Sequence, residues 1–512
     1  MRDDMTLVGA RIHTMDLDRP TATAIAFRHG RVAELDPKIP TGRIIDLKGR
    51  TVLPGFIDSH VHFAMGAETL AQVDLEPARS RKDFERLVAE RASRSRSGEW
   101  VIARNWSEEN LAGGERPDKS WLAVAGEHPC VCWRMDYHGC VVNEAALRIL
   151  AAHHRLTEDP PGGQILRDAT GEPTGVLKES AAWVLLLPHI PPLRSDLMRD
   201  ALTKAGKYLA SLGVTAVGGM ETPNIIEDHL EALRDHLAVR ILVTLFHRDW
   251  PLDLSFAHSF SNGDRLAIIG SKAFVDGAFG QRTARMFEPY TDAPESRGMF
   301  VEYAQRGVLT EWMRFVRSSG LSPSVHAIGD EAVHVALNAI DDTDGPDAPP
   351  VRIEHAQTVA PTDIHRFAGR FVSMQPLHKP YDCRSALSKL GPQRLNRFFP
   401  FRALADAGGR LAFGSDWPVV SPDPIRGMAA AITGLDLAGT PFRPEDNITI
   451  HEALVAYTRT AAECLQFDAG VLRVGRLADC VVLDRDPYDC DWVNHQPRVL
   501  MTVLGGEVTF EA

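Results

Sequence analysis

The sequence lacks the features that mark secreted, membrane-spanning and nucleic-acid-binding proteins. Its seven cysteines include no CxxC pair, which disfavours a disulfide framework, a redox motif and a zinc finger. The apolar run AAWVLLLPHI stops far short of the roughly 18 residues that span a bilayer, and the first ten residues carry acids where a secretion signal carries bases. Lys and Arg number 56 against 68 Asp and Glu, and this net charge of −12 argues against nucleic acid or an anionic membrane as partner. We therefore expect a soluble, cytoplasmic protein.

Both ends of the 512-residue chain have the pattern of short β-strands. Near the start, apolar segments such as TAIAFRHGRVAEL are interrupted by Gly, Asp and Pro at hairpin spacing. Near the end, RLADCVVLD precedes RVLMTVLGGEVTFEA, in which two apolar runs flank a Gly-Gly turn. We predict that residues 1–55 and 466–512 form one small β domain.

Between these ends, apolar strand-like runs alternate with longer segments of helical period. This alternation predicts a parallel sheet covered by helices, and eight runs favour a closed (β/α)8 barrel over residues 56–465, with an open doubly wound sheet as the alternative. The eight runs are FIDSHVHF, GVTAVGGM, AVRILVTLF, RLAIIGSKAFV, LSPSVHAIG, VRIEHAQ, RFVSMQP and RLAFGSDWPV.

The segment of about residues 66–200, between the first and second runs, is too long for a single crossover. We interpret it as an insertion over the barrel mouth. It contains one clear amphipathic helix, KDFERLVAERASRSRS, in which Phe84, Leu87 and Val88 lie at i, i+3 and i+4.

Metal-binding side chains recur at the C-terminal ends of these strands, where a (β/α) barrel places its active site. His60 and His62 lie two apart on the first strand, so both imidazoles project to the same side. His326, His355 and Asp416 end three later strands. An isolated HxH pair is as often structural as functional, but the joint set is typical of zinc or a similar divalent ion.

Lys272 ends another predicted strand, and an ion pair with Asp276 is its simplest role. A lysine that is desolvated beside cations has a lowered pKa, however, and its neutral amine can add carbon dioxide to give a carbamate. Such a carbamate could bridge two metal ions that hold a hydroxide between them.

Six motifs spread in order over nearly the whole chain resemble the amidohydrolase superfamily, in the subgroup that includes N-substituted formamide deformylases. The resemblance implies a distorted (β/α)8 TIM barrel beside a small β-sandwich formed by both chain ends, with a metal site that includes a lysine, often carboxylated. The motifs are GFIDSHVHF, KAFVDGAFGQRTA, VHAIGDEAV, IEHAQ, FGSDWPV and VGRLADCVVLDRDP, and the implied ligands are His60, His62, Lys272, His326, His355 and Asp416.

Within the insertion, CVCWRMDYHGCVVNEAAL resembles the substrate-side region of that subgroup. The resemblance implies that His138 polarises the scissile carbonyl and that Asn143 contacts substrate, although both could instead tie down the loop. His378, after a later strand, could line the pocket or be solvated. Two departures put the substrate in doubt: Val141 replaces an expected aromatic residue, and GMET stands where an acid or histidine often ends the strand.

These observations predict a metal-dependent hydrolase that cleaves a carbon–nitrogen bond, other than a peptide bond, in a small amide-like molecule. Metal-activated hydroxide would attack the carbonyl, with Asp416 as proton shuttle and two Zn²⁺ ions bridged by carboxylated Lys272. A mononuclear site is the nearest rival. The alternatives in function are a hydantoinase-like hydrolase of cyclic amides and a non-hydrolytic isomerase, lyase or binding protein on the same scaffold. A homodimer is compatible with the sequence.

Overall fold

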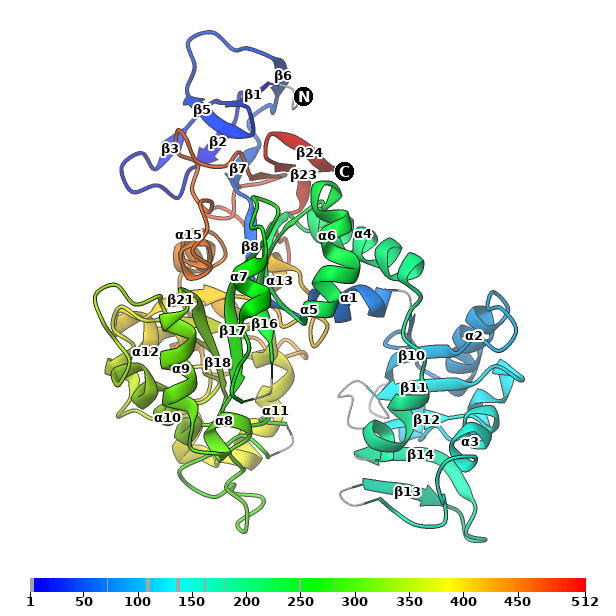
Figure 1. Ribbon diagram of the computed structural model, residues 1–512. Coiled ribbons are helices and arrows are strands. Elements are labelled where there is room, and N and C mark those ends of the chain that lie inside the picture. Colours follow the sequence, from blue (N-terminus) through cyan, green and yellow to red (C-terminus); the bar gives the residue numbers. More distant parts are fainter. Residues whose placement is uncertain are drawn as a thin grey trace. The chain divides into compact units, whose positions relative to one another are not determined.

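The computed structural model divides the chain into two compact units, Met1–Gly66 with Leu202–Ala512 and Ala67–Ala201 (Figure 1). Among the described residues, no helix has the length and apolar character needed to cross a membrane. The structure describes residues 4–70, 72–106, 111–134, 139–160, 163–179, 181–247, 250–280 and 282–512.

Eight parallel strands form the barrel of the larger unit, and all eight were predicted from the sequence. Their neighbour relations follow chain order around the sheet, as in a TIM barrel. Hydrogen bonds from Asp416 N to His60 O (2.7 Å) and from His62 N to Trp417 O (2.8 Å) join the last strand region to the first. The strands are β8 (Phe56–Val61), β15 (Val214–Glu221), β16 (Arg240–Phe246), β17 (Leu266–Phe274), β18 (Ser322–Ala327), β19 (Arg352–His355), β20 (Phe371–Met374) and β21 (Arg410–Phe413).

The barrel strands are short apolar runs because both of their faces are covered, as is usual for parallel sheets. Every residue of β15 is buried, for example. Helices α9 and α10 cover the outer side of β17 and β18 (Figure 1). The α-helices from residue 309 onward are α9 (Leu309–Ser318), α10 (Asp330–Asp341), α11 (His378–Leu390), α12 (Phe401–Asp406), α13 (Pro424–Thr433), α14 (Ile450–Ala456) and α15 (Arg459–Cys464).

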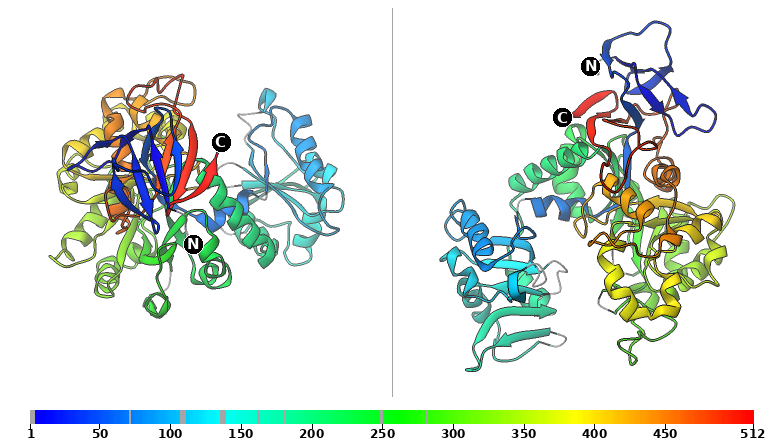
Figure 2. Two further views of the ribbon diagram at one scale, coloured as in Figure 1. Left: turned by 90° about the horizontal axis from the view of Figure 1, so that it is seen from above. Right: turned by 180° about the vertical axis from the view of Figure 1, so that it is seen from behind.

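Strands from both ends of the chain form the small β-sandwich, so the predicted fold class is confirmed. Figures 1 and 2 show the two termini in this region. One sheet has the order β5-β4-β1-β6 and the other β24-β23-β22-β7-β2-β3, and a shared core contains Leu7 and Phe27 beside Val482 and Val503. The strands are β1 (Met5–Val8), β2 (Arg11–His13), β3 (Thr21–Ala22), β4 (Ile25–Arg28), β5 (Arg31–Leu35), β6 (Arg43–Asp46), β7 (Thr51–Pro54), β22 (Cys480–Leu483), β23 (Val499–Leu504) and β24 (Glu507–Glu511).

The smaller unit has a sheet of its own, in the order β13-β14-β12-β11-β10-β9. On one side of it, Phe84 of α2 meets Trp121 edge to face, with ring centres 5.4 Å apart. The elements are β9 (Val73–Asp74), α2 (Arg81–Ala92), β10 (Val101–Trp106), β11 (Cys130–Arg134), β12 (Gly139–Val142), α3 (Glu144–Ala151), β13 (Gly163–Arg167) and β14 (Pro173–Glu179).

Helix α2 is shorter than the sequence predicts. It ends at Ala92 instead of continuing through the polar run that follows. Two serines just past this end donate to helix carbonyls, from Ser93 Oγ to Glu90 O (2.9 Å) and from Ser95 Oγ to Arg91 O (3.1 Å). The run has no apolar side chain to bury, and local serine hydrogen bonds compete with helix propagation.

Candidate metal centre

The predicted ligands all lie at or just beyond the C-terminal ends of barrel strands, so the fold brings them to one end of the barrel. They are His60 in β8, His62 one residue after it, Lys272 in β17, His326 in β18, His355 at the end of β19 and Asp416 three residues after β21.

Three of these residues converge closely. His60, His355 and Asp416 each offer a ligand atom, and the three atoms lie within 4.8 Å of one another. Asp416 Oδ1 is 3.3 Å from both His60 Nε2 and His62 Nε2. The ring centre of His355 is 5.1 Å from that of His60 and 4.5 Å from that of His326. The structure thus brings four imidazoles and one carboxylate together.

A hydrogen bond on one ring nitrogen determines which nitrogen of each imidazole is free to bind metal. His355 Nδ1 donates to Gln375 Oε1 (2.7 Å), and His326 Nε2 donates to Gly277 O (3.1 Å). In a neutral imidazole the opposite nitrogen, Nε2 of His355 or Nδ1 of His326, then carries the lone pair. For His60, Nδ1 is 2.7 Å from Glu354 Oε2, which leaves Nε2 toward Asp416.

The residues present fit a divalent metal ion. His60 Nε2 is buried and makes no hydrogen bond, although it lies 3.3 Å from Asp416. An unsatisfied polar atom in a protein interior is costly, and a cation at this nitrogen would satisfy it. Imidazole nitrogens with one carboxylate oxygen are ligands that zinc prefers.

Two of the ligand residues have backbone conformations that strands do not use. The φ angle is +75° at His355 and +59° at Asp416, and Ala356 follows with +41°. Non-glycine residues rarely occupy this left-handed region, and those that do cluster at functional sites. The backbone therefore marks this end of the barrel as a candidate functional site.

Burial sets the protonation of three basic ligands. It lowers the pKa of Lys272 to about 8, against the opposing attraction of Glu354 and Asp416. It also lowers the pKa of His326 to about 3, with help from Lys272, and holds the pKa of His355 well below its ordinary value. The two imidazoles are therefore neutral at pH 7, as metal binding requires.

Asp416 and His60 shift each other's pKa. Burial alone would raise the pKa of Asp416, but His60 and His62 hold it well below its usual range. Burial and Lys272 lower the pKa of His60, yet Glu354 and Asp416 outweigh them and raise it. A metal ion therefore competes with a proton at His60.

Lys272 is 1% exposed, and its Nζ lies 5.1 Å from the ring centre of Phe274. The simpler role as a partner of Asp276 has little support, because Asp276 accepts from backbone instead. Its carboxylate receives the N–H groups of Ile328 (3.0 Å), Gly329 (2.8 Å) and Arg285 (2.8 Å). Asp276 thus holds loops together, and the charges that act on Lys272 include Glu354 and Asp416.

Sequence reasoning missed the residues that hold the ligands. Asp58 accepts from Ser415 N (2.9 Å) and Ser415 Oγ (2.6 Å), which ties the segment carrying Asp416 to β8. Glu354 and Gln375 orient two histidines, as described above. The available signal was a charged residue inside an apolar strand run, as in FIDSH and RIEH.

The predicted substrate-binding residues differ in their surroundings. Asn143 caps α3, where its Oδ1 accepts from Ala146 N (3.1 Å) and Cys130 N (3.0 Å). His378 begins α11, and its Nε2 is 3.2 Å from Ser415 O, beside Asp416. His138 lies outside the described residues.

The segment GMET was expected to lack the acid that often ends its strand, and this was wrong. Glu221, within that segment, is the last residue of β15 and is buried. Its Oε1 accepts from Ala64 N (3.0 Å), which fixes the chain just after His62.

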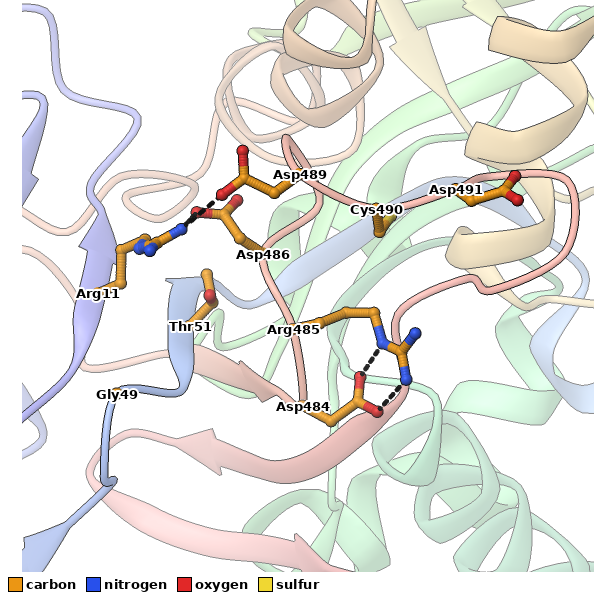
Figure 3. A pocket seen from close by; sticks show the side chains of 9 residues that line it. All are labelled: Arg11, Gly49, Thr51, Asp484, Arg485, Asp486, Asp489, Cys490 and Asp491. Atoms are coloured by element: carbon orange, nitrogen blue, oxygen red, sulfur yellow. Dashed lines mark hydrogen bonds and ion pairs between the residues drawn. The ribbon is translucent and has the colours of Figure 1, made fainter.

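A hollow of about 410 Å³ in the β-sandwich has no part in this centre. Within it, Arg11 Nη1 contacts Asp486 (2.8 Å) and Asp489 (2.7 Å), and Arg485 contacts Asp484 (Figure 3). Its carboxylates outnumber its arginines, and we assign the hollow no chemistry.

Comparisons with known proteins agree with the geometry. A model of the amidohydrolase family matches residues 43–510. Protein LONG AFTER FAR-RED 3 of Arabidopsis thaliana is 32% identical over 98% of this chain and 91% of its own. The N-substituted formamide deformylase of Arthrobacter pascens is 27% identical over 99% and 98%. A solved structure of an uncharacterized metal-dependent hydrolase from Pyrococcus horikoshii OT3 is 26% identical, with a TM-score of 0.79 over 96% of this chain and 99% of that one.

Proposed function

Because the chain belongs to the amidohydrolase family, we propose that it hydrolyses a carbon–nitrogen bond, other than a peptide bond, in a small amide-like molecule. The observation that carries the proposal is the convergence of His60, His355 and Asp416. The buried Nε2 of His60 makes no hydrogen bond there. His62, His326 and Lys272 lie at the same end of the barrel and complete the proposed ligand set.

The chemistry that a bound divalent ion supplies is activation of water at neutral pH and polarisation of a carbonyl. Zinc matches the donor set. Lys272 supports a two-ion site, because an amine with a pKa near 8 is partly neutral at pH 7 and can react with carbon dioxide. The rival to the two-ion site is a site with one ion. A measurement of metal content per chain distinguishes them.

Asp416 is the proposed proton carrier. Its carboxylate is ionised and lies 3.3 Å from two imidazoles, at the point where the strand ends converge. It accepts a proton from the attacking water and returns it to the leaving nitrogen, so one group acts first as general base and then as general acid. The return step avoids expelling an amide anion.

Three residues are candidates to bind the substrate. His378, beside Ser415, lies near Asp416 and is a candidate to contact the substrate. His138 stays a candidate for polarising the carbonyl, and Asn143, which caps α3, stays a candidate to contact the substrate.

The test is product analysis on a panel of amides. N-substituted formamides head the panel because the Arthrobacter pascens relative is named for them, and anilides and hydantoins follow. We expect equimolar acid and amine from at least one exocyclic amide, lost when a chelator removes the metal and regained when Zn²⁺ returns. Ring opening of hydantoins alone would favour the cyclic-amide alternative. Metal-loaded protein that releases neither product from any of them would favour an isomerase, a lyase or a binding protein.

A further inference from the structure

A chain of buried polar side chains lies behind His60. It crosses the barrel through Thr244 in β16, Ser324 in β18, and Arg352 and Glu354 in β19. All four are at most 1% exposed. Polar groups are rare in a barrel interior, which is usually filled by branched apolar side chains.

The two carboxylate oxygens of Glu354 have separate partners. Oε1 accepts from Ser324 Oγ (2.6 Å) and Arg352 Nε (2.5 Å), and Oε2 lies 2.7 Å from His60 Nδ1. Arg352 is fixed in turn, because its Nη2 donates to Thr244 Oγ1 (2.5 Å). The carboxylate therefore has one orientation, with Oε2 facing the imidazole.

Stability alone does not account for this chain. Removing an arginine and a carboxylate from water costs several kcal/mol per ion, and well-packed apolar residues often serve as well or better. Here Arg352 also keeps one N–H group, Nη1, without a hydrogen bond. A functional gain must offset that cost.

We propose that Glu354 is a positioning residue that holds His60 with its proton on Nδ1 and its Nε2 directed at the metal, and that Arg352 holds Glu354 in place. The inference rests on the proposed metal centre. A carboxylate on the far nitrogen of a metal-binding histidine fixes the tautomer and ring orientation, and its loss typically costs 10- to 100-fold in metal affinity.

The Glu354→Gln variant separates orientation from packing, because glutamine keeps the shape. If its amide oxygen faces His60, its NH2 group meets the N–H of Arg352, and two donors oppose each other. If the amide turns over, its NH2 group faces His60 Nδ1 and favours a proton on Nε2, the wrong tautomer. Either arrangement weakens the ligand.

The matched control is Ser324→Ala, which removes a hydrogen bond from Glu354 Oε1 but leaves the contacts to Arg352 and His60. Zn²⁺ affinity is measured by competition with a chelator, using the full chain. We expect a loss of about 10- to 100-fold for Glu354→Gln and of less than about threefold for Ser324→Ala. The visible spectrum of Co²⁺-loaded protein should change in Glu354→Gln alone, which loss of packing would not explain.

Unchanged Zn²⁺ affinity and an unchanged Co²⁺ spectrum in Glu354→Gln would overturn the inference and leave the proposed function standing. Wild-type protein that binds no metal would overturn both. Should Glu354→Gln fail to fold, Arg352→Lys replaces it, because a lysine amine cannot reproduce the fork that joins Glu354 to Thr244. That variant should lose about tenfold in affinity, and wild-type affinity would again overturn the inference.

Discussion

Three histidines at the barrel end, His60, His326 and His355, have one ring nitrogen at hydrogen-bond distance from another protein group. These groups are Gln375 for His355, the carbonyl of Gly277 for His326 and Glu354 for His60. His326, His355 and Asp416 are then already in the protonation states that a cation requires, whereas a metal ion must displace a proton from His60. A metal ion would find its ligands arranged, so little reorganisation is needed on binding.

Asp416→Asn tests the proton shuttle. The amide is nearly isosteric and can still bind metal weakly through oxygen, but it cannot accept a proton. We expect most of the metal to remain and turnover to fall at least about a hundredfold, the low end for a general base. Metal content by mass spectrometry and initial rates of amine release measure the two effects. Near-normal turnover would end the shuttle role.

Lys272→Ala tests the carbamate. The variant should lose metal and activity, and short carboxylic acids that fill the space should partly restore both, because they supply the missing two-oxygen anion. Lys389→Ala is the control, since that buried lysine donates to Gly280 O (3.0 Å) in the same part of the barrel and is no proposed ligand. A Lys272→Ala protein that binds two metal ions without added acid would show that no bridge is needed.

The sequence predicted side chains that the structure brings together at the barrel end, but not the residues that hold them; that they bind metal stays a prediction. His60, His355 and Asp416 could be found because each ends an apolar run at the reactive end of a barrel. Glu354 could not be assigned to His60, since 294 residues separate them and only the closed barrel brings them together.

The ends of the barrel strands determine where the predicted ligands lie. All eight barrel strands were predictable because apolar runs of this length, separated by helical segments, have few other arrangements. Boundaries were less predictable, as α2 shows by ending at Ala92. Its end depends on local serine hydrogen bonds that periodicity does not reveal.

Helix α11 carries an ionisable group that should make stability depend on pH. Lys379 is 2% exposed, its Nζ makes no hydrogen bond, and burial lowers its pKa from 10.5 to about 8. Between these values the unfolded chain binds a proton that the folded protein does not, so the free energy of unfolding rises as pH increases from about 8 to 10.5. Below pH 8 the buried charge costs about 3 kcal/mol.

Lys379→Met should therefore stabilise the protein at pH 7, by up to about 3 kcal/mol, and abolish that rise with pH. Urea unfolding at pH 7 and pH 9.5 measures both effects. Lys389→Met is the matched control, because Lys389 is also buried but has a hydrogen bond to lose, so its replacement should not stabilise. The assignment would be refuted if the free energy of unfolding of the wild type decreased from pH 7 to pH 9.5 and Lys379→Met did not alter that behaviour.

Over the whole molecule, a buried ion pair joins the barrel to the β-sandwich. Arg240, at the start of β16, donates from Nε (2.7 Å) and Nη2 (2.8 Å) to Asp479, just before β22. Asp479 also accepts from Gly505 N (2.7 Å) in the turn between β23 and β24. The sequence predicted a sandwich from both chain ends, but not this pair, whose members are 239 residues apart.

Arg240→Met should leave Asp479 buried without its counter-charge and lower stability by about 3 to 5 kcal/mol. The double variant Arg240→Met/Asp479→Leu removes both charges and should be clearly more stable than Arg240→Met alone. Thermal unfolding of the three proteins gives the comparison. A double variant less stable than Arg240→Met would contradict this expectation, because it would mean that Asp479 stabilises the fold without Arg240, for instance by accepting from Gly505 N.

The proposed chemistry depends on where the protein binds metal. That residues 66–200 cover the barrel mouth stays a prediction, as does the substrate. The most direct measurement is anomalous diffraction from crystals of Zn²⁺-loaded protein. The account predicts one or two zinc peaks among His60, His62, His326, His355 and Asp416, with added density on Lys272 if there are two. Zinc peaks only elsewhere in the molecule, with these histidines bonded to one another or to water, would contradict it.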